Sequence, residues 1–90
     1  MIVAEIHYTN LFKKQLRKLP AFITKQAINK ENIFKDNPLH PSLRLHGLHG
    51  KYRGIWTISI TGSYRIIFER QENGDILFLS IGSHDIYKYL

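Results

Sequence analysis

The chain has 90 residues, of which 43% are apolar and none is cysteine. This length predicts one domain over residues 1–90 with a modest core, and the lack of cysteine excludes disulfides and thiolate metal sites. No apolar run approaches the roughly 18–20 residues that cross a bilayer, and the start, MIVAEIHYTN, lacks a signal-peptide layout, so we expect a cytoplasmic protein. The net charge of +6 favours nucleic acid, the ribosome or an acidic protein as partner.

The first half of the chain predicts a strand, two helices and a loop, at residues 2–8, 11–19, about 21–35 and 36–42. Apolar and polar residues alternate in the strand. Thr9 or Asn10 is placed to cap the first helix, whose apolar residues recur along one helical face. Pro20 ends this helix or begins the next.

After residue 42 the apolar pattern changes to a period of two, which is typical of strands. Four strands are predicted, near residues 43–48, 52–60, 64–70 and 76–82. Asn73-Gly74, between the last two, is a strong hairpin signal. The predicted fold class is therefore α+β: an N-terminal strand, a two-helix hairpin, and a four-stranded antiparallel meander with the helices packed on one sheet face.

Turn lengths predict the register of this meander. A two-residue turn at Asn73-Gly74 places Phe68 opposite Leu79, Ile66 opposite Ile81, and Arg65 opposite Gly82. A three-residue loop at 61–63 is preferred to a two-residue one, because a slip of one residue inverts every side chain. This loop places Ile60 opposite Tyr64, Ile58 opposite Ile66, and Trp56 opposite Phe68. A turn at Gly50-Lys51 pairs His46 with Ile55 and Arg44 with Thr57.

This register separates an apolar face from a polar, cationic face. The apolar face is the expected core and holds Leu43, Leu45, Trp56, Ile58, Ile60, Ile66, Phe68, Leu77, Leu79 and Ile81. The polar face holds Arg44, His46, Thr57, Ser59, Arg65, Ser80 and, beyond the strand end, His84, with Ile67 and Phe78 as apolar exceptions. Because Arg65 lies opposite Gly82, we expect Arg65 and His84 to lie within reach of each other.

Residues 40–60 carry His40, His46 and His49 but no acidic residue. A metal site is disfavoured there, because neutral imidazoles beside arginines lack an anionic ligand. Cleavage of RNA without a metal suits the polar face better. Imidazoles exchange protons near neutral pH, and a guanidinium holds phosphate through paired hydrogen bonds. The predicted catalytic set is Arg65 and His84, with His46 or His49 opposite.

Further basic and aromatic residues suggest contacts with RNA. Arg44, Lys51 and Arg53 add positive charge around the histidines and are expected to bind RNA. Tyr87 or Tyr89 is placed either to stack on a base or to pack on the sheet edge. The basic helix segment KKQLRK contacts phosphate or an acidic partner, or is simply solvated.

Four segments resemble the RelE/ParE toxin superfamily of bacterial toxin–antitoxin systems: LFKKQLRKL, HPSLRLHGLHGKYRGIWTISI, SYRIIFE and LFLSIGSHDIYKY. The resemblance covers nearly the whole chain and is nearest to the mRNA interferase branch with the YafQ, YoeB and RelE/StbE groups. It implies a toxin that cleaves mRNA in the ribosomal A site, without a metal or cofactor, through a 2′,3′-cyclic phosphate.

The resemblance also implies residue roles. Arg65 in the YRI motif would bind the scissile phosphate, His84 would be the general acid, and Tyr87 the nearby aromatic residue. The base varies between branches; here the candidates are His46 and His49, with Arg44 as a cationic helper, because residues 40–50 offer no equivalent of the YoeB-type glutamate. A small antitoxin would cover the toxin and neutralise it.

Two other functions remain open on the same fold: a ParE-like inhibitor of DNA gyrase, which binds a protein and needs no acid–base pair, and a non-catalytic RNA-binding module. The combination of Arg65 and His84 favours the nuclease, because a gyrase inhibitor has no chemical need for these two residues.

Overall fold

The computed structural model describes residues 1–90, apart from the side chain of Tyr89. Its helices and strands are, in chain order, β1 (Ile6–Tyr8), α1 (Asn10–Lys18), α2 (Ala21–Asp36), β2 (His46–Gly47), β3 (Ile55–Ser59), β4 (Arg65–Arg70) and β5 (Ile76–Gly82). Three 3₁₀ segments complete the chain: η1 (Pro41–Leu43), η2 (Gly50–Tyr52) and η3 (His84–Tyr89). The predicted α+β class is confirmed.

The sheet has five strands in the order β1-β5-β4-β3-β2. Strands β2 to β5 form the predicted antiparallel meander, while β1 adds a parallel strand beside β5. The predicted N-terminal strand, residues 2–8, is too long, because regular pairing begins at Ile6. Before that point the chain still runs alongside the last hairpin, since Ala4 N donates to Gly74 O at 3.1 Å.

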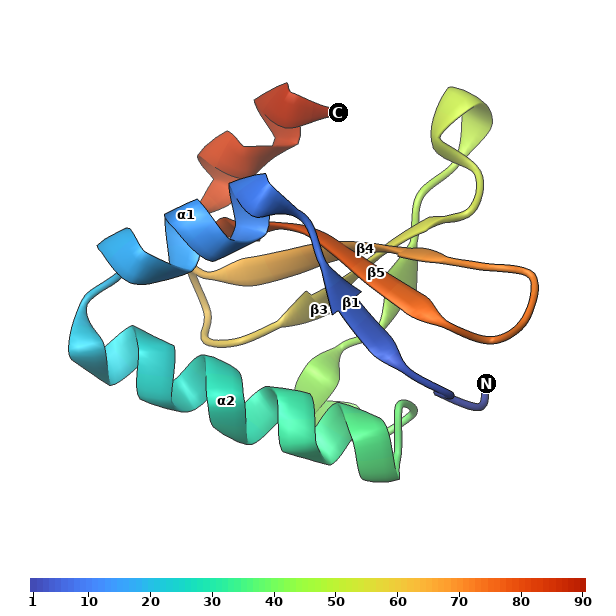
Figure 1. Ribbon diagram of the computed structural model, residues 1–90, viewed down its shortest axis with the longest axis horizontal. Coiled ribbons are helices and arrows are strands. Elements are labelled where there is room, and N and C mark those ends of the chain that lie inside the picture. Colours follow the sequence, from blue (N-terminus) through green and yellow to red (C-terminus); the bar gives the residue numbers. More distant parts are fainter.

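Local signals account for the two helices. Thr9 caps α1, because its Oγ1 accepts from Phe12 N at 3.0 Å. Pro20 precedes α2, and its carbonyl accepts from Thr24 N at 3.0 Å. Figure 1 shows α2 along one side of the sheet and the C-terminal η3 on the other.

The core lies between the helices and one face of the sheet. Phe12 of α1 and Phe34 of α2 pack there against Phe68 and Phe78. Its other buried members are Ala27, Leu43, Ile58, Ile60, Ile66, Ile76 and Ile81. The opposite sheet face, which carries Thr57, Ser59, Arg65, Ile67 and Ser80, is called the outer face below.

The β3–β4 register is as predicted, with Trp56 opposite Phe68 and Ile58 opposite Ile66. The β4–β5 register is right only at one end. Arg65 lies opposite Gly82 and Ile66 opposite Ile81, but the pairing then shifts.

Past this shift, Phe68 faces Phe78 and not Leu79. The irregularity leaves Leu79 without a partner, as in a β-bulge. The turn is also longer than two residues, since Gln71 N donates to Asp75 O at 2.8 Å. Phe78 and Ile76 are therefore core residues, and the assignment of Leu77 and Leu79 to the core face was wrong.

The first hairpin differs most from its prediction. Instead of a tight turn, Gly50–Tyr52 forms the 3₁₀ turn η2, so His46 lies opposite Thr57 and not Ile55. Because the error is two residues, His46 keeps its predicted face. The strand predicted at 43–48 shrinks to His46–Gly47, since Pro41–Leu43 is helical and Arg44 has a left-handed backbone with φ 48°. Arg44 is consequently not paired with Thr57.

Strand β1 is held to α2 by Tyr8, whose hydroxyl donates to the Glu31 carboxylate. Burial, followed by this bond to Glu31, raises the pKa of Tyr8 to about 12. Among the described residues, none of the helices combines the length and the apolar character that crossing a membrane requires.

Candidate functional site

Arg65 is the first residue of β4 and lies on the outer face between Ser59 of β3 and Gly82 of β5. Its side chain is half-buried. Within the described part of the chain, its Nε is the one buried side-chain nitrogen or oxygen without a hydrogen-bond partner. Leaving a buried donor unpaired costs about 1–3 kcal/mol. A ligand oxygen that accepts a hydrogen bond from this nitrogen would remove that cost.

His84 opens η3, two residues after the glycine that pairs with Arg65. Its ring is exposed and stacks on Tyr87, with ring centroids 6.0 Å apart and planes at 28°. The structure therefore places Tyr87 against the histidine itself. Both lie at the end of β5 where Arg65 begins β4, so the two residues expected to act together share one end of the outer face.

Gly82 and Ile86 hold η3 in place. Ile86 is only 4% exposed, and a Cβ added at Gly82 would lie 2.6 Å from Ile86 Cγ2. The absence of a side chain at Gly82 thus lets η3 fold back onto the strand that carries it. This close approach fixes the position of η3 and therefore of His84, its first residue.

His46 and His49 lie at the other edge of the sheet. Both are exposed, and their rings meet edge to face with centroids 6.1 Å apart. With Arg53 they line a hollow of about 360 Å³ above Trp56. Gly47 packs flat on the Trp56 indole, where an added Cβ would lie 3.2 Å from the ring, so the backbone next to His46 is closely seated.

The other expected RNA contacts lie around this edge. Lys51 has its Nζ 5.1 Å from the centroid of the Tyr52 ring, and Arg53 ends η2. The loop that holds them projects from the sheet in Figure 1. Arg44 lines a separate hollow of about 200 Å³ with Lys30, Ser42 and Ser59. It is therefore next to a second cation, Lys30, which the sequence pattern did not indicate.

Two strands separate β2, which carries His46, from the end of β5, and His49 follows β2 at the start of η2. At ~4.8 Å per strand, β2 and β5 are roughly 14 Å apart. The expected catalytic residues thus form two groups on the outer face: Arg65 with His84, and His46 with His49. The centre between them is closed, because Thr57, Ser59 and Ser80 are at most 6% exposed.

His40 has a local role. Its Nδ1 accepts from Ser42 N at 3.1 Å and so caps η1. A cluster that the sequence analysis missed lies at the opposite end of the sheet, where His7 contacts Asp75 and Glu5. The sequence does place Glu5 and His7 on the same side of the predicted N-terminal strand. The third residue, Asp75, joins them only through the parallel pairing of β1 with β5, which the sequence does not reveal.

Known structures share this architecture of two helices on a five-stranded sheet. A YoeB/ParE toxin from Agrobacterium tumefaciens matches with TM-score 0.76 and 15% identity, over 90% of this chain and 99% of that one. YafQ from E. coli strain BL21(DE3) matches with TM-score 0.73 and 15% identity, over 92% and 96%. The RelB-RelE antitoxin-toxin complex from Methanococcus jannaschii matches with TM-score 0.73 and 26% identity, over 93% and 98%.

These matches define the fold as that of the RelE/ParE toxin superfamily, as predicted. No curated protein matches the sequence. Residues 6–86 match the family described as the ParE toxin of type II toxin-antitoxin system, parDE, and the chain belongs to that family.

Proposed function

We propose that this toxin is an mRNA endoribonuclease that acts on the ribosome, in the A site, in the cytoplasm. The observation that carries the proposal is the buried Nε of Arg65, which has no hydrogen-bond partner among the described residues and lies beside the segment that opens with His84. An unpaired buried donor calls for a partner, and an RNA phosphate is the partner that a guanidinium suits best.

The reaction needs only protein groups and the substrate. A base removes the proton from the ribose 2′-hydroxyl, the 2′-oxygen forms a bond to phosphorus, and the bond from phosphorus to the 5′-oxygen breaks. His84 gives its proton to that leaving oxygen, which yields a 2′,3′-cyclic phosphate and a 5′-hydroxyl end. Arg65 stabilises the charge that grows on the phosphate oxygens. No metal or cofactor takes part in these steps.

His46 or His49 is the proposed base, because both imidazoles are exposed on the side of the outer face across from His84. With β2 roughly 14 Å from β5, the base and His84 would both have to extend toward the phosphate held by Arg65 to come within hydrogen-bond reach of it. Arg44, Lys51 and Arg53 would hold the flanking phosphates around this edge. Tyr87 would keep the His84 ring oriented through their stacked contact. Single His46→Gln and His49→Gln variants separate the two bases: the true base should lose about 10²–10⁴-fold in cleavage rate, and the other imidazole much less.

The test of the nuclease is primer extension on mRNA from cells that express the toxin, which should show cuts within translated codons. Arg65→Ala and His84→Gln should each remove these cuts and the growth arrest. Arg70→Ala and His40→Gln are the matched controls, because Arg70 lies at the other end of β4 and His40 caps its own turn. Cuts that persist in both site variants would reject the nuclease.

The second candidate is inhibition of DNA gyrase, which is favoured by the family description, a ParE toxin. A supercoiling assay with purified gyrase and toxin distinguishes the two. Under the nuclease proposal supercoiling continues at the uninhibited rate, and Arg65→Ala makes no difference. Gyrase inhibition that persists in the Arg65→Ala and His84→Gln variants would establish gyrase inhibition as the function and reject the nuclease.

We further propose that a cognate antitoxin covers the apolar groove between α1 and α2. Among the structures with this fold are the toxin-antitoxin complex RelBE2 from Mycobacterium tuberculosis and the RelB-RelE antitoxin-toxin complex from Methanococcus jannaschii. Here Phe22 and Ile28 are 67% and 53% exposed, and Ile28 borders a hollow of about 190 Å³ with Phe12 and Leu16. Ile28→Asp should weaken co-purification with a co-expressed antitoxin, whereas Lys35→Asp, near the end of α2, should not.

A further inference from the structure

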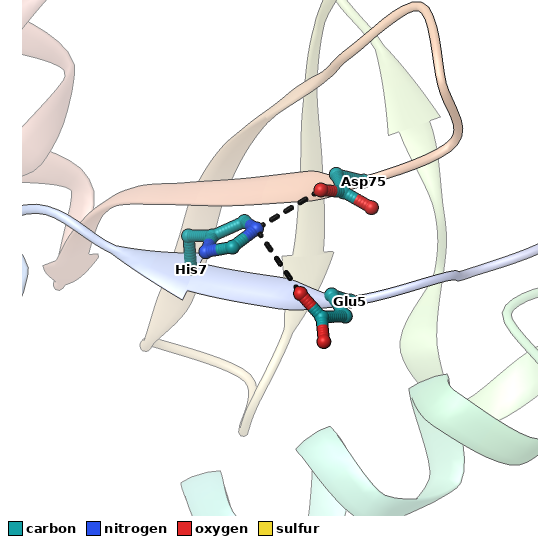
Figure 2. Close-up of side chains that lie close together, drawn as sticks. All are labelled: Glu5, His7 and Asp75. Atoms are coloured by element: carbon teal, nitrogen blue, oxygen red, sulfur yellow. Dashed lines mark hydrogen bonds and ion pairs between the residues drawn. The ribbon is translucent and has the colours of Figure 1, made fainter.

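Glu5, His7 and Asp75 converge at the end of the outer face farthest from Arg65. His7 Nε2 lies 3.0 Å from Asp75 Oδ2 and 3.8 Å from Glu5 Oε2. Figure 2 shows both carboxylates directed at this one nitrogen. One ligand atom from each of the three residues falls within 4.8 Å of the others.

The backbone brings these side chains together. Glu5 and His7 are two residues apart, so they project from the same side of an extended chain. Ile6 pairs with Ile76 in the parallel ladder, and Ile76 N donates to Glu5 O at 2.8 Å. Asp75 therefore lies directly across from Glu5, and its own N–H donates to Asn73 Oδ1 at 2.9 Å. Two separate segments are thus held in register before any ligand arrives.

We propose that this cluster is a Zn²⁺ site. An imidazole nitrogen and two carboxylate oxygens are ligands that zinc accepts at about 2.0–2.2 Å, with water completing the tetrahedron. Magnesium and calcium prefer an all-oxygen set. Ligand atoms around a tetrahedral ion of that size lie about 3.3–3.6 Å apart, so small rotations of these side chains, two of them exposed, suffice.

The charge of the cluster agrees with this assignment. The ion would lie between His7 Nε2 and the two carboxylates that are already directed at this nitrogen. Two negative charges then face one dication, in a chain whose net charge is +6.

Zinc here would join β1 to the residue just before β5, because His7 and Asp75 are 68 residues apart along the chain. A ligand that binds only the folded state stabilises it by mass action. The site is independent of the proposed nuclease. Asp75 and Gly82 are seven residues apart along β5, roughly 23 Å at ~3.3 Å per residue.

The experiment is calorimetric titration of ZnCl₂ into the full chain at pH 7.5 after removal of metal with EDTA. We expect saturable binding of one ion per chain. Glu5→Gln, His7→Gln and Asp75→Asn should each weaken it by at least about tenfold, since even outer-shell changes cost 10–100-fold. Glu5 and His7 are exposed, whereas Asp75 is partly buried, and circular dichroism will confirm that the variants fold.

The double variant His46→Gln/His49→Gln is the control. It removes two exposed histidines outside the cluster and should leave the affinity for zinc within twofold. The melting temperature should rise by about 5 °C or more in zinc at tenfold its Kd, but not in His7→Gln. No saturable binding, or binding lost in the control, overturns the proposal. Because mRNA cleavage should persist in His7→Gln, neither outcome affects the proposed nuclease.

Discussion

Position 82 has no room for a side chain, because its Cβ would overlap Ile86. Ile86 is β-branched and therefore stiff at χ1, so its Cγ2 moves only if η3 moves as a whole. The glycine in the segment IGSH thus sets the path of the chain from β5 into the turn that presents His84.

Gly82→Ala should therefore displace η3 and reduce mRNA cleavage by at least about tenfold, since misplacement by 1 Å can cost ~10²-fold. Overpacking should also lower the free energy of unfolding by roughly 1–3 kcal/mol. Cleavage by purified toxin on programmed ribosomes, together with urea unfolding, measures both effects. Gly62→Ala is the control, because a Cβ there meets nothing within 4 Å. Cleavage at the wild-type rate by Gly82→Ala would show that the position of η3 does not matter.

At this scale one pairing was predicted correctly through two errors that cancel. Arg65 was placed opposite Gly82 by counting from a two-residue turn; the turn is one residue longer, and the β-bulge near Phe68 takes up that extra residue before Arg65 is reached. The contact between Gly82 and Ile86 could not be counted in this way, because it depends on a 3₁₀ turn after the last strand. The zinc cluster was missed because Asp75 joins it through pairing between strands far apart in the chain.

Among the elements, α1 depends most on a single side chain at its start. Thr9 Oγ1 accepts from Phe12 N at 3.0 Å and donates to Leu79 O at 2.8 Å. The same hydroxyl therefore caps the helix and ties it to β5. It also satisfies the carbonyl of the residue that the β-bulge leaves without a strand partner.

Thr9→Ala should lower the free energy of unfolding by about 1–2 kcal/mol, the upper part of the range for a lost N-cap. Urea unfolding followed by circular dichroism should show a lower midpoint with an unchanged slope. Thr9→Ser keeps the hydroxyl and should retain most of the stability. If Ser and Ala are equally destabilising, the loss comes from the methyl group and not from the two hydrogen bonds.

Element boundaries were predictable where one periodic pattern ran without interruption. Both helices and the β3–β4 hairpin agree within one residue at most ends, since their apolar spacing and capping residues act locally. The β-bulge near Phe68 and the helical turn at Gly50–Tyr52 were not predictable, because each inserts residues that alternation does not reveal. The one-residue error in the β4–β5 register assigned Leu77, Leu79 and Phe78 to the wrong faces. The error in the first hairpin is two residues, an even number, so His46 was still assigned to the correct face.

The whole molecule presents positive charge to its partners. The net charge is +6, and the cationic residues near the candidate site come from α2, β4 and the loops around β2. A single-stranded RNA that contacts these residues releases counterions, so its affinity should fall with salt. The number of phosphate contacts can then be read from the salt dependence.

Arg65 should account for about one of these contacts. On a short single-stranded RNA, in a His84→Gln background that prevents cleavage, log K against log salt should be linear for the toxin. Adding Arg65→Ala should make the slope shallower by about 0.7, the value for one phosphate on a single strand, because its guanidinium alone has a buried unpaired donor in the described part of the chain.

Adding Arg70→Ala removes the same charge from the far end of β4 and should leave the slope unchanged. The pair of variants therefore separates a specific contact from the general attraction of a basic protein. Equal changes in both would mean that Arg65 acts only through net charge. The phosphate would then have to be held elsewhere, most directly by Arg44 and Lys30, which line their own hollow.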